Sequence, residues 1–180
     1  MYTLDKHNIG KIAERIVMNE LEYHGYRATD LNKDGLSANS DILVVKNGKT
    51  WQIQVKGATN KITDRWWVQY GHCNEKTISK ESTVFNSKDS FYIADYVALV
   101  AIKSPSNYRI FIMPTKIAER AAQINMDRYY RKPKVSDGGI RKPGKIWVAV
   151  EGTERERQKD PLLDEEREIL QKSENQWELY

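Results

Sequence analysis

The amino-acid sequence predicts an α/β fold in which a mixed central β-sheet is flanked by helices. Segments 8–24 and 115–131 carry apolar residues at helical spacing. Residues 41–56 have the pattern of two strands joined by an Asn-Gly turn, and apolar runs of strand length follow at 96–102 and 108–113. Because one helix precedes these strands and another follows them, a sheet covered by helices is the expected architecture.

The first helix is expected over residues 8–24, with Asn8 as its N-cap and Gly25 at its end. Its apolar residues at helical spacing are Ile9, Ile12, Ala13, Ile16, Val17 and Leu21. Residues 26–30 are then predicted to form a short edge strand, and residues 31–40 a polar loop.

A β-hairpin is the clearest local prediction. Its strands are residues 41–46 and 49–56, and Asn47-Gly48 is the preferred two-residue turn between them. A two-residue loop sets the register of the strands, so the numbers of paired residues sum to 95.

The remaining chain alternates between strands, loops and helices. Residues 57–90 are expected to form an excursion from the sheet. The other predicted elements are strands at 96–102 and 108–113 joined by a turn at 105–107, a helix at 115–131, a loop at 133–144, a short strand at 146–150 and a helix at 162–172.

Length and composition predict one soluble domain over residues 1–180, with a core at about 8–150 and an acidic tail at 151–180. No apolar run reaches the ~18–20 residues that span a bilayer, so we expect a cytoplasmic protein. The single cysteine excludes an internal disulfide framework and a multi-cysteine zinc site.

The positive charge is concentrated in one block. Residues 103–145 contain 11 basic and 3 acidic residues, a net charge of +8, whereas the tail carries −5. Basic groups interleaved with aromatics suit a phosphate backbone, although a solvated surface would have the same composition. We also expect the acidic tail to dock on the basic face of a partner subunit.

The hairpin register brings polar side chains together at its open end. Asp41 lies opposite Gln54, and Gln54 shares one face of its strand with Lys56. A carboxylate and an amide oxygen can hold Mg²⁺, and a nearby lysine can hold or deprotonate a metal-bound water. Glu14, at the flank of the first helix, can reach over the sheet edge toward the same place. The alternative is a strand with a polar outer face beside a solvated glutamate.

At these residues the sequence resembles the PD-(D/E)XK nuclease superfamily, and is most similar to its small cyanobacterial intron-encoded homing-endonuclease branch. The resemblance covers residues 9–57 and, more loosely, 91–115. It departs from the common pattern at Ser40, which replaces a proline, and at Gln54, which replaces a carboxylate.

The resemblance implies a restriction-endonuclease-like fold and assigns four catalytic residues, Glu14, Asp41, Gln54 and Lys56. In this assignment Glu14, Asp41, Gln54 and the backbone carbonyl of Val55 bind Mg²⁺, or Mn²⁺ as a substitute. Lys56 orients or activates the attacking water.

The predicted function is that of a Mg²⁺-dependent endonuclease that hydrolyses phosphodiester bonds of double-stranded DNA, of homing or restriction type. Such a protein would be encoded by a bacterium, an archaeon or a phage. Cutting both strands needs two active sites, so a homodimer or homotetramer is expected. The alternatives are a structure-selective enzyme such as a Holliday junction resolvase, a catalytically decayed DNA-binding protein on the same fold, and an interaction module that binds no nucleic acid.

Contacts with DNA are predicted for basic, polar and aromatic side chains in the excursion and in the basic block. These residues are Lys61, Arg65, Trp67, His72, Asn74, Lys76, Arg128, Arg131, Lys132, Lys134, Arg141 and Lys142.

Overall fold

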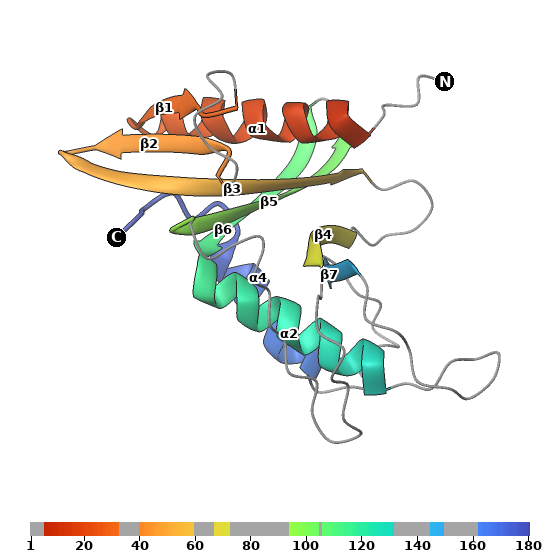
Figure 1. The fold of residues 1–180 in the computed structure, drawn as a ribbon. Coiled ribbons are helices and arrows are strands. Elements are labelled where there is room, and N and C mark those ends of the chain that lie inside the picture. Colours follow the sequence, from red (N-terminus) through yellow and green to blue (C-terminus); the bar gives the residue numbers. More distant parts are fainter. Residues whose placement is uncertain are drawn as a thin grey trace.

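A five-stranded mixed sheet forms the centre of the computed structural model (Figure 1), with strand order β1-β2-β3-β5-β6. The structure describes residues 6–32, 40–59, 67–72, 94–104, 106–131, 145–149 and 162–180. The strands are β1 (Arg27–Asp30), β2 (Ile42–Lys46), β3 (Lys49–Thr59), β5 (Tyr96–Ser104) and β6 (Asn107–Pro114). β3 and β5 pair in parallel and the other neighbours are antiparallel, which confirms the predicted mixed sheet.

Helices cover both faces of this sheet. Helix α1 (Lys6–Tyr23) lies on one face, while α2 (Thr115–Arg131) and α4 (Leu162–Ser173) lie on the other (Figure 1). The apolar side of α1 packs on inward-facing residues of the strands, such as Ile53 and Val55. The predicted α/β class is therefore confirmed. None of the described helices is long and apolar enough to cross a membrane.

The predicted N-cap of the first helix is wrong. Helix α1 begins at Lys6, so Asn8 lies inside the helix and does not cap it. The helix starts before the first apolar residue of its buried side. The predicted end at Gly25 is confirmed. Gly25 has a φ of 82°, and the backbone N–H of Tyr26 donates to the carbonyl of Leu21 across the last turn.

The hairpin has the predicted register, in which Ile42 pairs with Ile53 and Lys46 with Lys49. Asn47 and Gly48 both have positive φ, at 52° and 74°, as a type I′ turn requires. β2 starts one residue later than predicted, and β3 continues three residues further than predicted, to Thr59.

Two short strands form a second sheet. Strand β4 (Trp67–His72) pairs with β7 (Lys145–Ala149) in antiparallel fashion. The first lies within the predicted excursion, and the second is the short strand that was expected at 146–150. This pair is separate from the five-stranded sheet (Figure 1).

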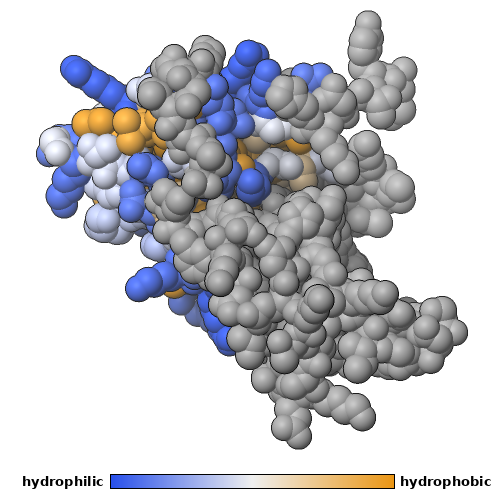
Figure 2. Space-filling view, in the orientation of Figure 1, coloured by the Kyte–Doolittle hydropathy of each residue, from blue (hydrophilic) through white to orange (hydrophobic). Residues whose placement is uncertain are grey.

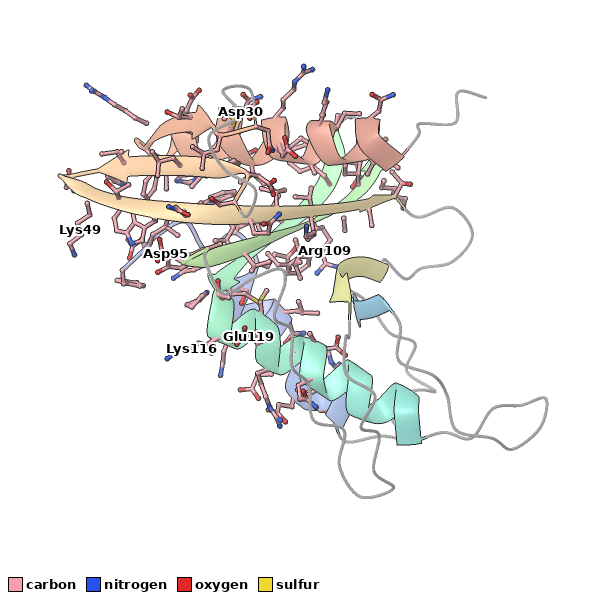
Figure 3. The ribbon with its side chains drawn as sticks, viewed as in Figure 1. Asp30, Lys49, Asp95, Arg109, Lys116 and Glu119 are labelled. Atoms are coloured by element: carbon pink, nitrogen blue, oxygen red, sulfur yellow. The ribbon has the colours of Figure 1, made fainter. Side chains whose placement is uncertain are left out.

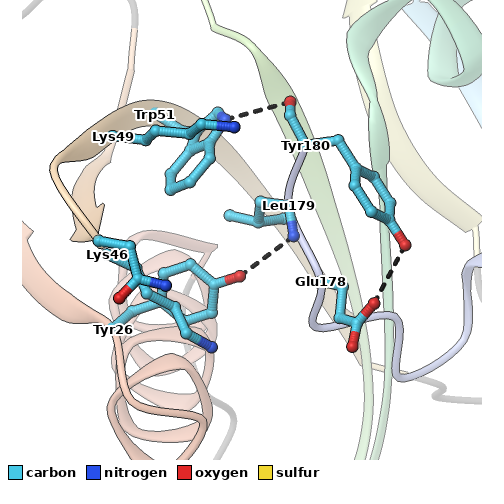
Figure 4. Close-up of a pocket in the computed structure, with 8 residues that line it drawn as sticks. Tyr26, Lys46, Lys49, Trp51, Glu178, Leu179 and Tyr180 are labelled. Carbon is cyan, nitrogen blue, oxygen red and sulfur yellow. Dashed lines mark hydrogen bonds between the residues drawn. The ribbon is translucent and has the colours of Figure 1, made fainter.

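The C-terminal segment belongs to the core, contrary to the expected core boundary near residue 150. Leu179 is 7% exposed and joins the core cluster beneath α1. The Tyr26 hydroxyl donates to the Trp177 carbonyl (2.7 Å) and accepts a bond from the Leu179 N–H (3.1 Å; Figure 4). The net charge of −5 over residues 151–180 indicated an acidic tail, but charge does not show where the apolar residues of this segment pack.

Acidic residues of this C-terminal region pair within the chain. Glu174 makes a two-pronged ion pair with Arg109, and Glu165 makes one with Arg120 of α2. These described carboxylates therefore dock on the chain's own basic residues, whereas the sequence suggested a partner subunit. Figure 3 shows Arg109 on the side of the sheet that faces away from α1.

Tyr26→Phe is expected to destabilise the fold by about 1–3 kcal/mol, because it leaves the buried Leu179 N–H and the partly buried Trp177 carbonyl without their shared partner. Urea unfolding measures this loss. Tyr23→Phe is the matched control, since Tyr23 is 86% exposed, and its effect should stay within about 0.5 kcal/mol. Equal stability of the two variants would show that the C-terminal segment does not depend on this hydroxyl.

Candidate active site

The candidate site lies at the open end of the hairpin, where Asp41 meets β3. The backbone of Asp41 is held on two sides: its N–H donates to the Ile53 carbonyl (3.0 Å), and its carbonyl accepts from the Leu31 N–H (2.9 Å). The β2 ladder starts at Ile42. Beyond the pair of Ile42 with Ile53, this edge of the β3 backbone contacts the side chain of Asp41 instead of another strand.

The carboxylate of Asp41 accepts three hydrogen bonds. Its Oδ2 accepts from Gln54 Nε2 (2.6 Å) and from the Val55 N–H (2.7 Å). Its Oδ1 accepts from Asn32 Nδ2 (3.1 Å). The structure thus brings Asp41 and Gln54 into contact, as the hairpin register predicts.

Val55 presents its backbone to the same place. In a β-strand the backbone N–H and carbonyl of one residue point toward the same neighbouring strand. Because the Val55 N–H donates to Asp41, its carbonyl also lies on the Asp41 side of β3. This is the position that the sequence-based assignment requires for a backbone ligand.

Lys56 lies on the sheet face opposite α1. Its neighbours Val55 and Gly57 face the helix, and side chains alternate along the strand. Burial lowers the pKa of the Lys56 amine, and the carboxylates of Asp41 and Glu14 partly offset this effect. The amine therefore lies within the electrostatic reach of both predicted acidic residues.

Glu14 completes the predicted group from α1. Burial raises the pKa of its carboxyl group, and the negative charge of Asp41 raises it further. A hydrogen bond with the side chain of Asn32 acts in the opposite direction. Glu14 thus lies within electrostatic range of Asp41 and Lys56.

A glycine allows α1 to lie this close to β3. A Cβ atom added at Gly57 would lie 2.6 Å from the Cβ of Ala13 and 3.2 Å from the carbonyl oxygen of Ile9. Ala13 precedes Glu14 and Gly57 follows Lys56. The close contact between these small residues therefore brings the backbones of α1 and β3 together next to Glu14 and Lys56.

The residue before Asp41 is anchored by its buried side-chain hydroxyl group. Ser40, at 2% exposure, donates from its Oγ to Gln52 Oε1 (3.0 Å). The Gln52 N–H in turn donates to Asp95 Oδ2 (2.8 Å). The serine that departs from the common motif thus links the chain before Asp41 to β3.

Two carboxylates, one amide and one backbone carbonyl are the oxygen donors of this site. Within the described ranges, no group of three or more His, Cys, Asp and Glu residues is placed to hold a metal ion. A cation here would depend on amide and carbonyl oxygens in addition to Asp41 and Glu14. Such oxygens are suitable ligands for Mg²⁺, which also keeps several waters.

The predicted DNA contacts are not placed by the structure. Lys61, Arg65, Asn74, Lys76, Lys132, Lys134, Arg141 and Lys142 lie outside the described residues. Trp67 and His72 are in β4, and Arg128 and Arg131 are in the last turns of α2, where the structure describes only the backbone.

Sequence reasoning missed Asn32, which contacts two of the predicted residues. It fell within the predicted polar loop, and the only signal was its position two residues after Asp30, a spacing typical of an Asx turn. The Asn32 N–H indeed donates to Asp30 Oδ1 (2.9 Å). Figure 3 shows Asp30 on the α1 side of the sheet.

A pocket lies at the opposite, closed end of the hairpin. It has a volume of about 270 Å³ and lies between the hairpin tip and the C-terminal segment (Figure 4). Tyr26 and Trp51 form part of its wall. Figure 2 shows that the described surface on one face of the molecule is mostly hydrophilic, with small hydrophobic patches.

The fold defined here is a mixed α/β sheet with helices on both faces. A similar solved structure is that of a bacterial homing endonuclease, I-Ssp6803I, with a TM-score of 0.43 and 16% sequence identity over 95% of each chain. No protein-family model and no curated protein matches the sequence.

Proposed function

We propose that this protein is a DNA endonuclease of the PD-(D/E)XK type that depends on Mg²⁺ or Mn²⁺. The observation that carries the proposal is the convergence of Asp41, Gln54 and Lys56 at the open end of the hairpin, with Glu14 of α1 beside them. Carboxylate and amide oxygens that can hold a cation, next to a buried amine, can support metal-assisted phosphodiester hydrolysis.

Each donor has a defined role in this proposal. Among the described residues, Oδ2 of Asp41 accepts two hydrogen bonds and Oδ1 accepts one, so Oδ1 has a lone pair left for a cation. The amide nitrogen of Gln54 is bound to Asp41, which leaves its oxygen for the same cation. The Val55 carbonyl and the Glu14 carboxylate complete the donor set. A divalent cation bound there would supply Lewis acidity and lower the pKa of a coordinated water.

Lys56 acts on the water and on the charge of the reacting phosphate. Its lowered pKa makes it easier for the amine to lose a proton than for an exposed lysine. In the charged form it offsets the negative charge that develops on the phosphate oxygens. The negative charges of the Asp41 and Glu14 carboxylates favour this charged form.

Double-stranded DNA is the proposed substrate because the block at 103–145 carries a net charge of +8, of which Arg109 and Arg120 are paired with carboxylates of the C-terminal region. Two active sites are needed to cut both strands, so we infer a homodimer or homotetramer. Its setting would be the cytoplasm of a bacterium or archaeon, or of a phage-infected cell.

A decayed DNA-binding protein is the second candidate, and Gln54 favours it. The residue is neutral where a carboxylate is common, and it donates its amide N–H to Asp41. The two candidates differ in the effect of Gln54→Glu on Mn²⁺ titration. An endonuclease site would bind Mn²⁺ in both forms, and more tightly with Glu, whereas a decayed site would show no change.

Asp41→Asn is expected to reduce cleavage by at least about 100-fold, because it removes a charge at the cation and places an amide nitrogen among hydrogen-bond donors. Plasmid nicking with Mg²⁺ or Mn²⁺ measures this, with circular dichroism as the check on folding. Asp164→Asn, at an exposed carboxylate of α4, is the matched control and should keep full activity. The proposal fails if the wild type cuts neither linear, supercoiled nor branched DNA, or if Asp41→Asn cuts as well as the wild type.

A further inference from the structure

Asn32 joins two acidic side chains that come from different elements of the fold. Its Nδ2 donates to Asp41 Oδ1 (3.1 Å), and its side chain also hydrogen-bonds with Glu14. We propose that Asn32 is a positioning residue that holds the Glu14 and Asp41 carboxylates at one cation site. This inference rests on the proposed function.

The backbone around Asn32 is itself anchored. The Asn32 N–H donates to Asp30 Oδ1 (2.9 Å), and the preceding N–H, of Leu31, donates to the Asp41 carbonyl (2.9 Å). Leu31 is 7% exposed, so its side chain ties the turn to the interior. The Asn32 side-chain amide therefore extends from a turn that these hydrogen bonds hold in place.

The two carboxylates need such a link because each is held by a different part of the chain. Glu14 belongs to α1, whereas Asp41 directly precedes β2. Their like charges repel one another. An amide NH₂ group has two hydrogens and carries no charge, so it can bind both carboxylates without neutralising the charge that attracts a cation.

Asn32 is exposed, so its place in the fold does not depend on burial of its side chain. The Asn32 side chain acts through its hydrogen bonds with the two carboxylates. Groups that orient metal ligands typically change metal affinity by about 10–100-fold when they are removed. We therefore expect a specific loss of metal affinity with the fold retained.

Asn32→Leu, which keeps the approximate size but removes both donors, tests this role. Mn²⁺ affinity of the whole protein without DNA is measured by electron paramagnetic resonance of the free ion. We expect binding about 10-fold weaker than in the wild type. In nicking assays, the Mn²⁺ concentration for half-maximal rate should rise by a similar factor, while the rate at saturating Mn²⁺ stays within a few fold. Thr29→Ala, an exposed position of β1, is the matched control and should change neither value.

The outcomes separate this inference from the proposed function. Unchanged Mn²⁺ affinity in Asn32→Leu, together with lost binding in Asp41→Asn, overturns the role of Asn32 and leaves the endonuclease proposal intact. A fall in the saturating rate without weaker Mn²⁺ binding overturns it as well. A wild type that neither binds Mn²⁺ nor cuts DNA overturns both.

Discussion

Lys56→Met is expected to abolish DNA cleavage and, at the same time, to raise the thermal unfolding midpoint of the metal-free protein. The loss of rate should be about 10²–10⁴-fold, the range for removal of a group that transfers a proton or stabilises developing charge. The gain in stability follows from burial, which disfavours the charged amine more than the carboxylates of Asp41 and Glu14 favour it.

The pH dependence of this gain has a defined sign. In the folded state the pKa of Lys56 lies below its ordinary value of 10.5. Between these two pKa values the unfolded chain binds more protons, so the wild type becomes more stable as the pH rises. The advantage of Lys56→Met should therefore be largest at neutral pH and shrink as the pH rises toward 10.5.

Lys49→Met is the matched control for this experiment. Lys49 begins the same strand but is exposed at the tip of the hairpin, at its closed end (Figure 3). Its replacement should leave both the cleavage rate and the unfolding midpoint close to those of the wild type. A Lys56→Met protein that cuts DNA, or that melts below the wild type at neutral pH, would contradict the assignment of Lys56.

The contact between Asp41 and Gln54 could be predicted from sequence because it depends on one local feature. Asn47 and Gly48 form the turn, and the turn type determines the register of both strands. Once the register is known, alternation places Gln54 and Lys56 on one face. The type and order of the helices and strands of the five-stranded sheet followed from apolar periodicity together with turn residues.

The rest of the site depends on contacts between distant segments, which carry no periodic signal. Asn32 contacts Glu14 and Asp41 from a turn that looks like any polar loop in the sequence. Leu179 packs into the apolar core and its N–H donates to the Tyr26 hydroxyl, although the segment around it is acidic. Composition describes such a segment correctly as charged but does not show where it packs.

Gly57→Ala is expected to destabilise the protein by about 1–3 kcal/mol, because the added methyl group would overlap with α1. The nearest atom is the Cβ of Ala13, at 2.6 Å from the new methyl position. Cleavage should fall as well, since a helix pushed away from β3 carries Glu14 away from Lys56. Gly10→Ala is the matched control: no atom lies within 4 Å of its added methyl group, and it should stabilise α1 by about 1 kcal/mol.

The double variant Ala13→Gly, Gly57→Ala tests whether this contact is the cause. Ala13→Gly alone costs about 1 kcal/mol of helix propensity, but it removes the atom that the new methyl group would meet. The combined loss of stability should therefore be smaller than the sum of the two single losses, by at least about 0.5 kcal/mol, and cleavage should partly return. Additive losses in urea unfolding would mean that the two residues act independently. The spacing between α1 and β3 would then depend on other contacts, and the small residues beside Glu14 and Lys56 would have no part in aligning them.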